Sequence, residues 1–355
     1  MAQGLDGDAL KAFSFKVWTY KMGEQVSLMI HLGDRLGIYR AMSGSGPLTS
    51  DEVADRLDLH ERFVREWLLG QAAAGLIDHV DGAFELTDVQ AALLADEDDS
   101  VHFAQGAFRG GFEPDQIEKI AESFRTGVGL SYEQQGAAAA AGLARMTAPR
   151  SRLTLTDLVL PALDGVVEKL EAGAVVCDVG CGGGVMLTTL AEAYPNTTCV
   201  GIDPSGSALD LARARTQKMR LNNVEWIEGT GEDVEPGSDY DLIVTFDCMH
   251  DMAFPDRAAA AFRNALAPDG TWLIKDIRST GDFDKDRRNP MLALMYGFSV
   301  TSCLQSAMSE EGGRGLGTLG LHAEAAEEMT KAAGFSQFAT HDLEDPNNLF
   351  YEVRI

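Results

Sequence analysis

The stretch DVGCGGG, residues 178–184, follows a short apolar run and precedes a helical pattern. Gly180, Gly182 and Gly184 let the backbone turn sharply and approach a ligand closely, because no Cβ stands in the way. We therefore expect a cofactor-binding turn between a first strand and a helix. A tight turn that binds nothing is the alternative interpretation.

Around this turn, apolar strands alternate with helical segments. The predicted strands are AVVCDV (174–179), TTCVGID (197–203), NVEWIE (223–228), YDLIVTF (240–246) and GTWLIKDI (270–277). This alternation implies right-handed crossovers and a parallel sheet covered by helices on both faces. The segments 335–342 and 348–355 are predicted to close the sheet as a terminal strand pair. The predicted fold class is thus α/β, a doubly wound Rossmann-like sheet.

Two acids stand at the carboxyl ends of the first two strands. Asp203 ends the second strand, where a carboxylate accepts hydrogen bonds from ribose hydroxyls, although a chance acid at a strand end is the alternative. Asp178 precedes the first glycine, where a carboxylate can hold the cationic methionine end of a sulfonium cofactor. GLGTLG (315–320) matches a dinucleotide motif literally, but no clear strand leads into it, so we expect a loop or lid over the acceptor site.

The N-terminal part predicts a winged-helix unit. A helix over about 8–42, interrupted near Gly33, is followed by helices at 49–57 and 61–75 and by a hairpin at 76–87. Such a unit either reads DNA or serves dimerisation and substrate covering. Residues 48–90 contain ten acids and three arginines, whereas DNA binding needs a surplus of cations. We therefore expect a role in dimerisation and substrate covering. The predicted domains are residues 1–100 (winged helix), 101–170 (helical connector contributing to the acceptor pocket) and 171–355 (catalytic).

Composition narrows the partners and the compartment. The 355 residues carry 29 Lys and Arg against 55 Asp and Glu, a net charge of −26, which disfavours nucleic acid and anionic membranes as partners. The five cysteines form no C-x-x-C pair, so we expect reduced thiols, a cytoplasmic protein and no metal.

With DVGCGGG, Asp203 and the winged helix, the segment FDCMHDMAFPD (246–256) resembles the class I S-adenosylmethionine-dependent methyltransferases that carry a dimerisation domain. The resemblance implies this cofactor, a homodimer formed through the N-terminal domain, and a small organic acceptor. In that family an acid after the third strand contacts the adenine; this chain has Gly229-Thr230-Gly231 there, which leaves Glu232 or Asp233. The implied cofactor-binding residues are Asp178, Gly180, Gly182, Gly184, Asp203, Gly231, Glu232, Asp233, Asp247 and Cys248.

The resemblance also implies the catalytic pair. Related small-molecule O-methyltransferases use a His-Asp pair after the fourth strand as general base, and His250-Asp251 stands there. His250 would deprotonate a hydroxyl acceptor. It would only bind or orient a thioether, which has no proton to lose, and a structural histidine is the remaining alternative. The candidate acceptor-binding residues, which could equally be ordinary core or interface residues, are Trp18, Tyr20, Phe108, Arg109, Tyr132, Lys275, Arg278 and Tyr296.

A finer resemblance lies in residues 13–39, FSFKVWTYKMGEQVSLMIHLGDRLGIY, taken with the acidic composition. They are similar to bacterial S-methyltransferases that act on 4-methylthio-2-hydroxybutyrate in dimethylsulfoniopropionate synthesis. An O-methyltransferase for a phenol or hydroxy acid is the alternative enzyme. A transcriptional regulator that binds S-adenosylmethionine without catalysis is the alternative from another class, and the acidic winged helix argues against it.

Overall fold

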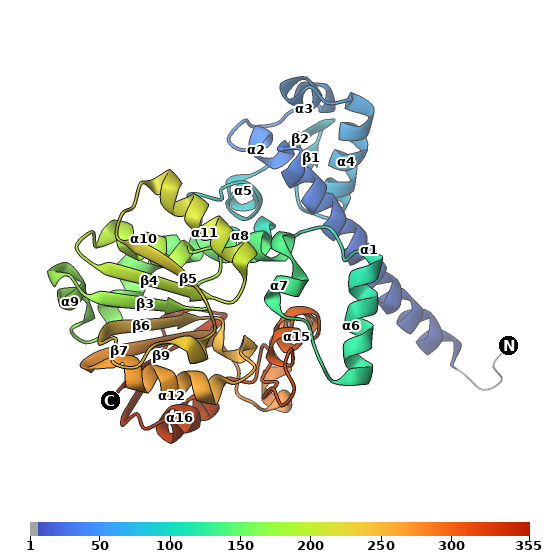
Figure 1. Ribbon diagram of the computed structural model, residues 1–355. Coiled ribbons are helices and arrows are strands. Elements are labelled where there is room, and N and C mark those ends of the chain that lie inside the picture. Colours follow the sequence, from blue (N-terminus) through green and yellow to red (C-terminus); the bar gives the residue numbers. More distant parts are fainter. Residues whose placement is uncertain (1–5) are drawn as a thin grey trace. The chain divides into compact units, whose positions relative to one another are not determined.

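The computed structural model describes residues 6–355, which fall into two compact units, 6–112 and 113–355 (Figure 1). In the first unit the helices are α1 (Gly7–Arg35), α2 (Ile38–Met42), α3 (Ser50–Leu57), α4 (Glu61–Ala73) and α5 (Asp88–Leu94), with a 3-10 turn at Gln105–Ala107. Strands β1 (Asp78–Val80) and β2 (Ala83–Glu85) form the wing. The predicted order of helices and hairpin is therefore present.

The chain turns within the wing as the sequence predicts. Asp81 and Gly82 both have positive φ, 52° and 83°, the conformation that a tight two-residue hairpin requires. Thr49 opens α3 with the predicted capping box to Glu52. Local sequence signals therefore determine both features.

The interruption of the first long helix was predicted at the wrong glycine. Helix α1 continues through Gly33 and ends at Arg35, and Gly37 supplies the left-handed residue, with φ 72°, that starts α2. Gly33 instead packs against the indole of Trp67, where an added Cβ would lie 2.3 Å from a ring carbon. Gly33 is therefore required for close packing rather than for a change of direction.

The second unit begins with the helices α6 (Pro114–Thr126), α7 (Tyr132–Gln135), α8 (Ala137–Thr154) and α9 (Val166–Ala172), with a π-helical turn (Leu155–Val159) and a 3-10 turn (Leu160–Ala162) before α9. The five consecutive alanines open α8. Between α6 and α8, Ser131 caps the short helix α7 through a capping box with Gln134. No apolar periodicity marks so short a helix.

The sheet of the second unit has seven strands in the order β5-β4-β3-β6-β7-β9-β8. They are β3 (Val175–Val179), β4 (Thr198–Asp203), β5 (Val224–Glu228), β6 (Tyr240–Phe246), β7 (Leu266–Ile277), β8 (Gln337–His341) and β9 (Asn348–Arg354). β3 to β7 are parallel, and β9 runs antiparallel between β7 and β8. This confirms the predicted Rossmann-like sheet and its terminal strand pair.

Helices cover both faces of this sheet (Figure 1). The longer ones after β3 are α10 (Val185–Ala193), α11 (Gly206–Met219), α12 (Pro255–Ala265) and α16 (Ala323–Ala332). Phe262 of α12 packs edge-on against Trp272 on one face, and Leu187 of α10 joins Leu170 in the core on the other. The carboxyl ends of the parallel strands are left for the loops that carry the candidate residues.

The remaining elements of the second unit are α13 (Phe283–Asp286), α14 (Leu292–Phe298), a π-helical turn (Ser299–Cys303) and α15 (Leu304–Ala307). As expected, no strand leads into residues 315–320. Between residues 6 and 355, no helix combines the length and the apolar character that crossing a membrane would require.

Candidate active site

The glycine turn lies where β3 meets α10. The N–H of Gly180 donates to the carbonyl of Ile202 at 2.8 Å, which ties the turn to the end of β4. Gly180, Gly182 and Gly184 all have positive φ, 72°, 52° and 70°. An added Cβ at Gly180 would lie 2.7 Å from Sγ of Cys248. The backbone therefore needs glycine both for its conformation and for this close approach.

Asp203 is joined directly to the glycine turn. Its Oδ2 accepts a hydrogen bond from the N–H of Gly182 at 2.7 Å, and its Oδ1 accepts one from the N–H of Ser205 at 2.9 Å. Burial raises the pKa of Asp203, although these two N–H groups lower it in part. The carboxylate is thus fixed beside the turn, with acceptor capacity left for further donors.

Asp178 at the end of β3 is a buried carboxyl group, and no cationic side chain among residues 6–355 forms an ion pair with it. It is 2% exposed, and its Oδ2 makes no hydrogen bond to any described residue. Burial, and next the negative charge of Asp203, raise the pKa of Asp178 to about 8. Two neighbouring acids that disfavour each other's ionisation form a site that a cationic ligand would stabilise.

The candidate residues for the adenine lie on a 3-10 turn, Gly231–Asp233, after β5. Oδ2 of Asp233 accepts hydrogen bonds from the N–H and the hydroxyl of Thr230, at 2.7 and 2.9 Å. Glu232 is half-exposed and lies 3.4 Å from Arg257. Asp233 is thus used to build the turn, which leaves Glu232 as the freer of the two carboxylates.

Asp247 is held by side chains of two other strands. Lys275 of β7 and Asn348 of β9 both donate to its carboxylate, and its φ of 53° is left-handed. The next residue, Cys248, donates its thiol to the carbonyl of Val179 at 3.1 Å. These contacts fix the chain between β6 and His250, and they engage Lys275, which the sequence predicts to contact the acceptor.

His250 lies between two carboxylates in the turn Met249–Asp251. Its Nδ1 is 2.6 Å from Oδ1 of Asp276, and its Nε2 is 3.4 Å from Oδ1 of Asp251; all three side chains are buried. Burial lowers the pKa of His250, but Asp276 and Asp251 outweigh it and raise this pKa well above its usual value. Both ring nitrogens therefore face side-chain carboxylates rather than backbone groups.

Tyr132 of α7 reaches the same cluster. Its hydroxyl donates to Oδ2 of Asp251 at 2.7 Å. The next residue, Glu133, accepts hydrogen bonds from the hydroxyls of Ser205 and Ser207, at 2.7 and 3.0 Å. Consecutive residues of α7 therefore contact the histidine cluster and the residues that follow Asp203.

The other candidates for the acceptor lie elsewhere or have other partners. Arg278 binds Asp342 through both terminal nitrogens, and Tyr296 of α14 is half-exposed beside the ring of Phe283. Trp18, Tyr20, Phe108 and Arg109 belong to the first unit. Their role in acceptor binding, like the role of residues 315–320 as a lid, stays a prediction.

Sequence reasoning missed three polar residues of this region, Asp276, Glu133 and Cys303. Asp276 ends the apolar run of β7 at the same sheet edge as Asp203, a strand-end signal that could have identified it. Cys303, at the end of the π-helical turn, approaches His250 and Asp251 from a distant part of the sequence. Nothing in the local sequence around Glu133 or Cys303 indicates these contacts.

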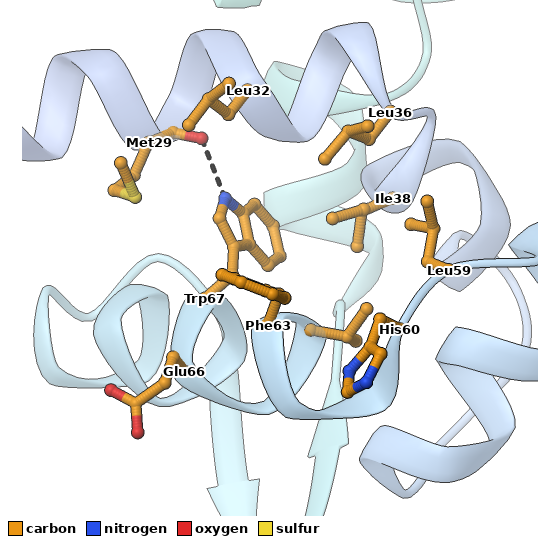
Figure 2. A pocket seen from close by; sticks show the side chains of 10 residues that line it. Met29, Leu32, Leu36, Ile38, Leu59, His60, Phe63, Glu66 and Trp67 are labelled. Atoms are coloured by element: carbon orange, nitrogen blue, oxygen red, sulfur yellow. Dashed lines mark hydrogen bonds between the residues drawn. The ribbon is translucent and has the colours of Figure 1, made fainter.

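The first unit contains a separate apolar pocket of about 600 Å³ between α1 and α4 (Figure 2). Trp67 forms one wall, and its Nε1 donates to the carbonyl of Met29 at 2.8 Å. The other residues that line the pocket are mainly aliphatic or aromatic, among them Leu32, Leu36 and Phe63. The lining offers shape and apolar surface rather than a set of catalytic groups.

Family comparisons agree with these two units. Residues 170–334 match the family model of a methyltransferase domain, and residues 24–95 match an Rv2258c-like winged HTH domain. The chain carries a methyltransferase domain behind a winged-helix domain. The matched residues include the glycine turn, Asp178, Asp203, His250 and Asp276, whereas Tyr132 and Glu133 of α7 precede them.

Curated relatives match about a third of this chain. The ubiquinone biosynthesis O-methyltransferase of Actinobacillus pleuropneumoniae is 29% identical over 126 residues, 33% of this chain and 53% of that protein. The enzyme of the same name from Acinetobacter baylyi is 28% identical over 108 residues, 30% and 44% of the two chains. The chain thus spans about half the length of the curated relatives it matches.

Solved structures share the fold of the whole chain. An O-methyltransferase family protein from Burkholderia thailandensis has a TM-score of 0.67 at 19% identity, covering 96% of this chain and 98% of that one. Human N-acetylserotonin methyltransferase, in complex with SAM, has a TM-score of 0.66 at 17% identity and covers 100% and 99%. The fold of this chain therefore also occurs in other solved proteins.

Proposed function

We propose that this protein binds S-adenosylmethionine and transfers its methyl group to a small organic acceptor. The observation that carries the proposal is the pair of buried carboxyl groups, Asp178 and Asp203, at the glycine turn. No described residue supplies a cation to Asp178, and the sulfonium and amino groups of this cofactor provide positive charge. Asp203 has acceptor capacity for the ribose hydroxyls, the role of an acid at this place in nucleotide-binding folds.

The side chains of the site have distinct tasks in this mechanism. When bound, S-adenosylmethionine supplies a methyl group already activated by the positive sulfur. Asp178 holds the cationic methionine end, Asp203 the ribose, and Glu232 is the better placed of the two candidates for the adenine. His250 and Asp251 position the acceptor, since holding the reacting groups in line accounts for much of such a reaction's acceleration.

Cofactor affinity should rise with pH up to about 8. Below that pH Asp178 is largely protonated in the free protein, because its pKa is raised to about 8. A bound cation favours the carboxylate, so binding releases a proton and weakens by up to about tenfold for each pH unit below the raised pKa. Calorimetry across this pH range, in buffers of different ionisation enthalpy, measures both quantities. Affinity independent of pH, with no proton released, would contradict this role of Asp178.

For the acceptor, the resemblance of residues 13–39 supports the thioether acid 4-methylthio-2-hydroxybutyrate. Both ring nitrogens of His250 face carboxylates, at 2.6 and 3.4 Å. A thioether needs no base, so this arrangement does not hinder its methylation. O-methylation of a phenol or hydroxy acid is the second candidate, because the relatives are named O-methyltransferases and Asp276 orients His250. Because its pKa is raised, His250 would first have to lose a ring proton in order to act as the general base.

The test is methyl transfer from labelled S-adenosylmethionine to each acceptor class by the full-length protein. We expect a labelled sulfonium product with the thioether acid. A labelled ether formed with phenols or hydroxy acids alone would establish the second candidate. Cofactor binding without transfer to any acceptor would contradict an enzyme and support the regulator, particularly if the protein is also retained on DNA.

We also propose that the first unit forms a homodimer. Helix α1 is about 43 Å long and exposes large apolar side chains, including Phe15 at 72% and Met22 at 60%. Monomeric proteins rarely leave so extended an apolar surface in water. A second copy of α1 would cover it, and the Trp67 pocket beside α1 (Figure 2) offers further apolar surface.

The five free cysteines and the acidic charge support a cytoplasmic location.

The double substitution Phe15→Asp and Met22→Asp should turn the dimer into a monomer. These positions are two turns apart on one face of α1, and two buried charges would oppose the association. Analytical ultracentrifugation measures the mass. The exposed Gln25→Asp is the control for added charge on the same helix and should leave the dimer intact. A wild-type protein that sediments as a monomer would exclude this assembly.

A further inference from the structure

Three side chains with different donor atoms converge at the acceptor end of the site. They are His250 and Asp251 of the Met249–Asp251 turn and Cys303, the last residue of the π-helical turn. The imidazole nitrogen, a carboxylate oxygen and the sulfur that they offer all lie within 4.8 Å of one another. π-helical turns are uncommon and often occur at functional sites.

The spacing suits a small tetrahedral ion. Nε2 of His250 and Oδ1 of Asp251 are 3.4 Å apart. Two ligand atoms at about 2.0–2.1 Å from a tetrahedral Zn²⁺ lie roughly 3.3 Å apart. The nitrogen and the oxygen therefore already have the separation that Zn²⁺ requires. The sulfur of Cys303 lies within 4.8 Å of the other two atoms. It needs to approach them by at most about 1.2 Å, because the nitrogen or oxygen and the sulfur on a tetrahedral Zn²⁺ are about 3.6 Å apart.

A hydrogen bond from or to a second residue orients each of the nitrogen and oxygen ligands. Nδ1 of His250 is bound to Asp276 at 2.6 Å, which leaves Nε2 toward the cluster. Oδ2 of Asp251 accepts from Tyr132, which leaves Oδ1 toward the cluster. A carboxylate behind a ligating histidine is the usual outer-sphere arrangement of protein zinc sites.

One ligand atom, Oδ1 of Asp251, has Nε2 of His250 3.4 Å away but forms no hydrogen bond with a described residue. Asp251 is buried, with its side chain 8% exposed, yet its Oδ1 makes no hydrogen bond to any residue in the described range 6–355. A buried carboxylate oxygen without a donor is costly unless something else neutralises it. A cation between Oδ1, Nε2 and the sulfur would do so.

We propose that His250, Asp251 and Cys303 bind a divalent zinc ion, with Asp276 and Tyr132 orienting two of these ligands. The donor set of nitrogen, oxygen and sulfur is the one that Zn²⁺ accepts, whereas Mg²⁺ and Ca²⁺ prefer oxygen alone. Three protein ligands leave the fourth position open. The ion would occupy the atoms of His250 and Asp251 that face the acceptor, and it would thereby inhibit the reaction.

Cobalt(II) is the probe for the sulfur ligand. Titration of the metal-free full-length protein with Co²⁺ should produce thiolate-to-cobalt charge-transfer absorption in the near ultraviolet, and Zn²⁺ should abolish it by displacement. Cys303→Ser should remove this band. Cys199→Ser is the matched control, because Cys199 lies near the opposite end of β4 and a serine there can keep the contact to Thr197. A wild-type protein without the band, or a band that persists in Cys303→Ser, would overturn the proposal.

A second measurement guards against a variant that merely misfolds. Competition with a chromophoric zinc chelator gives the affinity of each variant, and circular dichroism reports its folding. Folded Asp276→Asn should bind Zn²⁺ about 10–100-fold more weakly, the usual effect of losing an outer-sphere partner. Affinity equal to that of the wild type would show that Asp276 does not orient a ligand and would refute the assigned geometry.

The inhibitory part rests on the proposed methyl transfer. Zn²⁺ should suppress that activity, a chelator should restore it, and Cys303→Ser should resist the suppression. Activity unaffected by a Zn²⁺ concentration that saturates the cobalt-defined site would contradict inhibition. A protein with no methyl transfer at all would instead contradict the proposed function, and the cobalt titration would still decide the metal site.

Discussion

Replacing Asp203 by alanine should lower the affinity for S-adenosylmethionine at least about 100-fold, because each hydrogen bond to a charged group contributes roughly 1.5–3 kcal/mol and the ribose would lose two. The variant also removes the acceptor for the N–H groups of Gly182 and Ser205, which hold the glycine turn against β4. Isothermal titration calorimetry measures the affinity.

Two further variants make this result interpretable. Asp203→Asn keeps one acceptor oxygen and should bind the cofactor with intermediate affinity. Asp210→Ala removes an exposed carboxylate from the neighbouring helix α11 and should bind normally. Wild-type affinity in folded Asp203→Ala would refute the assignment of the ribose to this residue and, with it, the principal support for the proposed cofactor.

Replacing His250 by alanine should separate the two candidate acceptors. If the acceptor is a hydroxyl, the loss of the general base should slow methyl transfer about 100-fold or more. If the acceptor is a thioether, no proton is removed, and transfer should continue with weaker acceptor binding. Steady-state kinetics that separate kcat from KM make this distinction.

The alanine variant leaves Asp276 and Asp251 as unpaired buried acids, which costs about 3–5 kcal/mol of stability when a buried pair is broken. His250→Asn is therefore the second variant, since its amide N–H can replace Nδ1 toward Asp276 without acting as a base. His102→Ala, on an exposed histidine of the first unit, is the control. Unchanged kcat and KM with either acceptor in folded His250→Asn would show that His250 serves neither role.

The features that the sequence predicts correctly have local causes. The parallel strands appear as apolar runs, and the turn at Gly180–Gly184 appears as a glycine pattern between a strand and a helix. The hairpin of the wing follows from Asp81 and Gly82. In each case a few neighbouring residues determine the backbone conformation, so one segment suffices for the prediction.

The features that the sequence does not reveal depend on distant residues. Asp276 meets His250 only because β6 and β7 are adjacent in the sheet, and Cys303 approaches the pair from a helical segment further along the chain. The interruption predicted near Gly33 is misplaced for the same reason. Gly33 suits a helix end by local criteria, and the close packing of Trp67 against it is visible only in the structure.

The short helix α7 has a thermodynamic consequence. Tyr132 is hydrogen-bonded to Asp251, and the adjacent Glu133 is hydrogen-bonded to Ser205 and Ser207. A displacement of α7 at either residue would therefore strain the hydrogen bonds of the other. Binding of the cofactor beside Asp203 and binding of the acceptor beside His250 should therefore be cooperative. If the bound methyl donor raises the affinity for the acceptor by some factor, the bound acceptor must raise the affinity for the donor by the same factor.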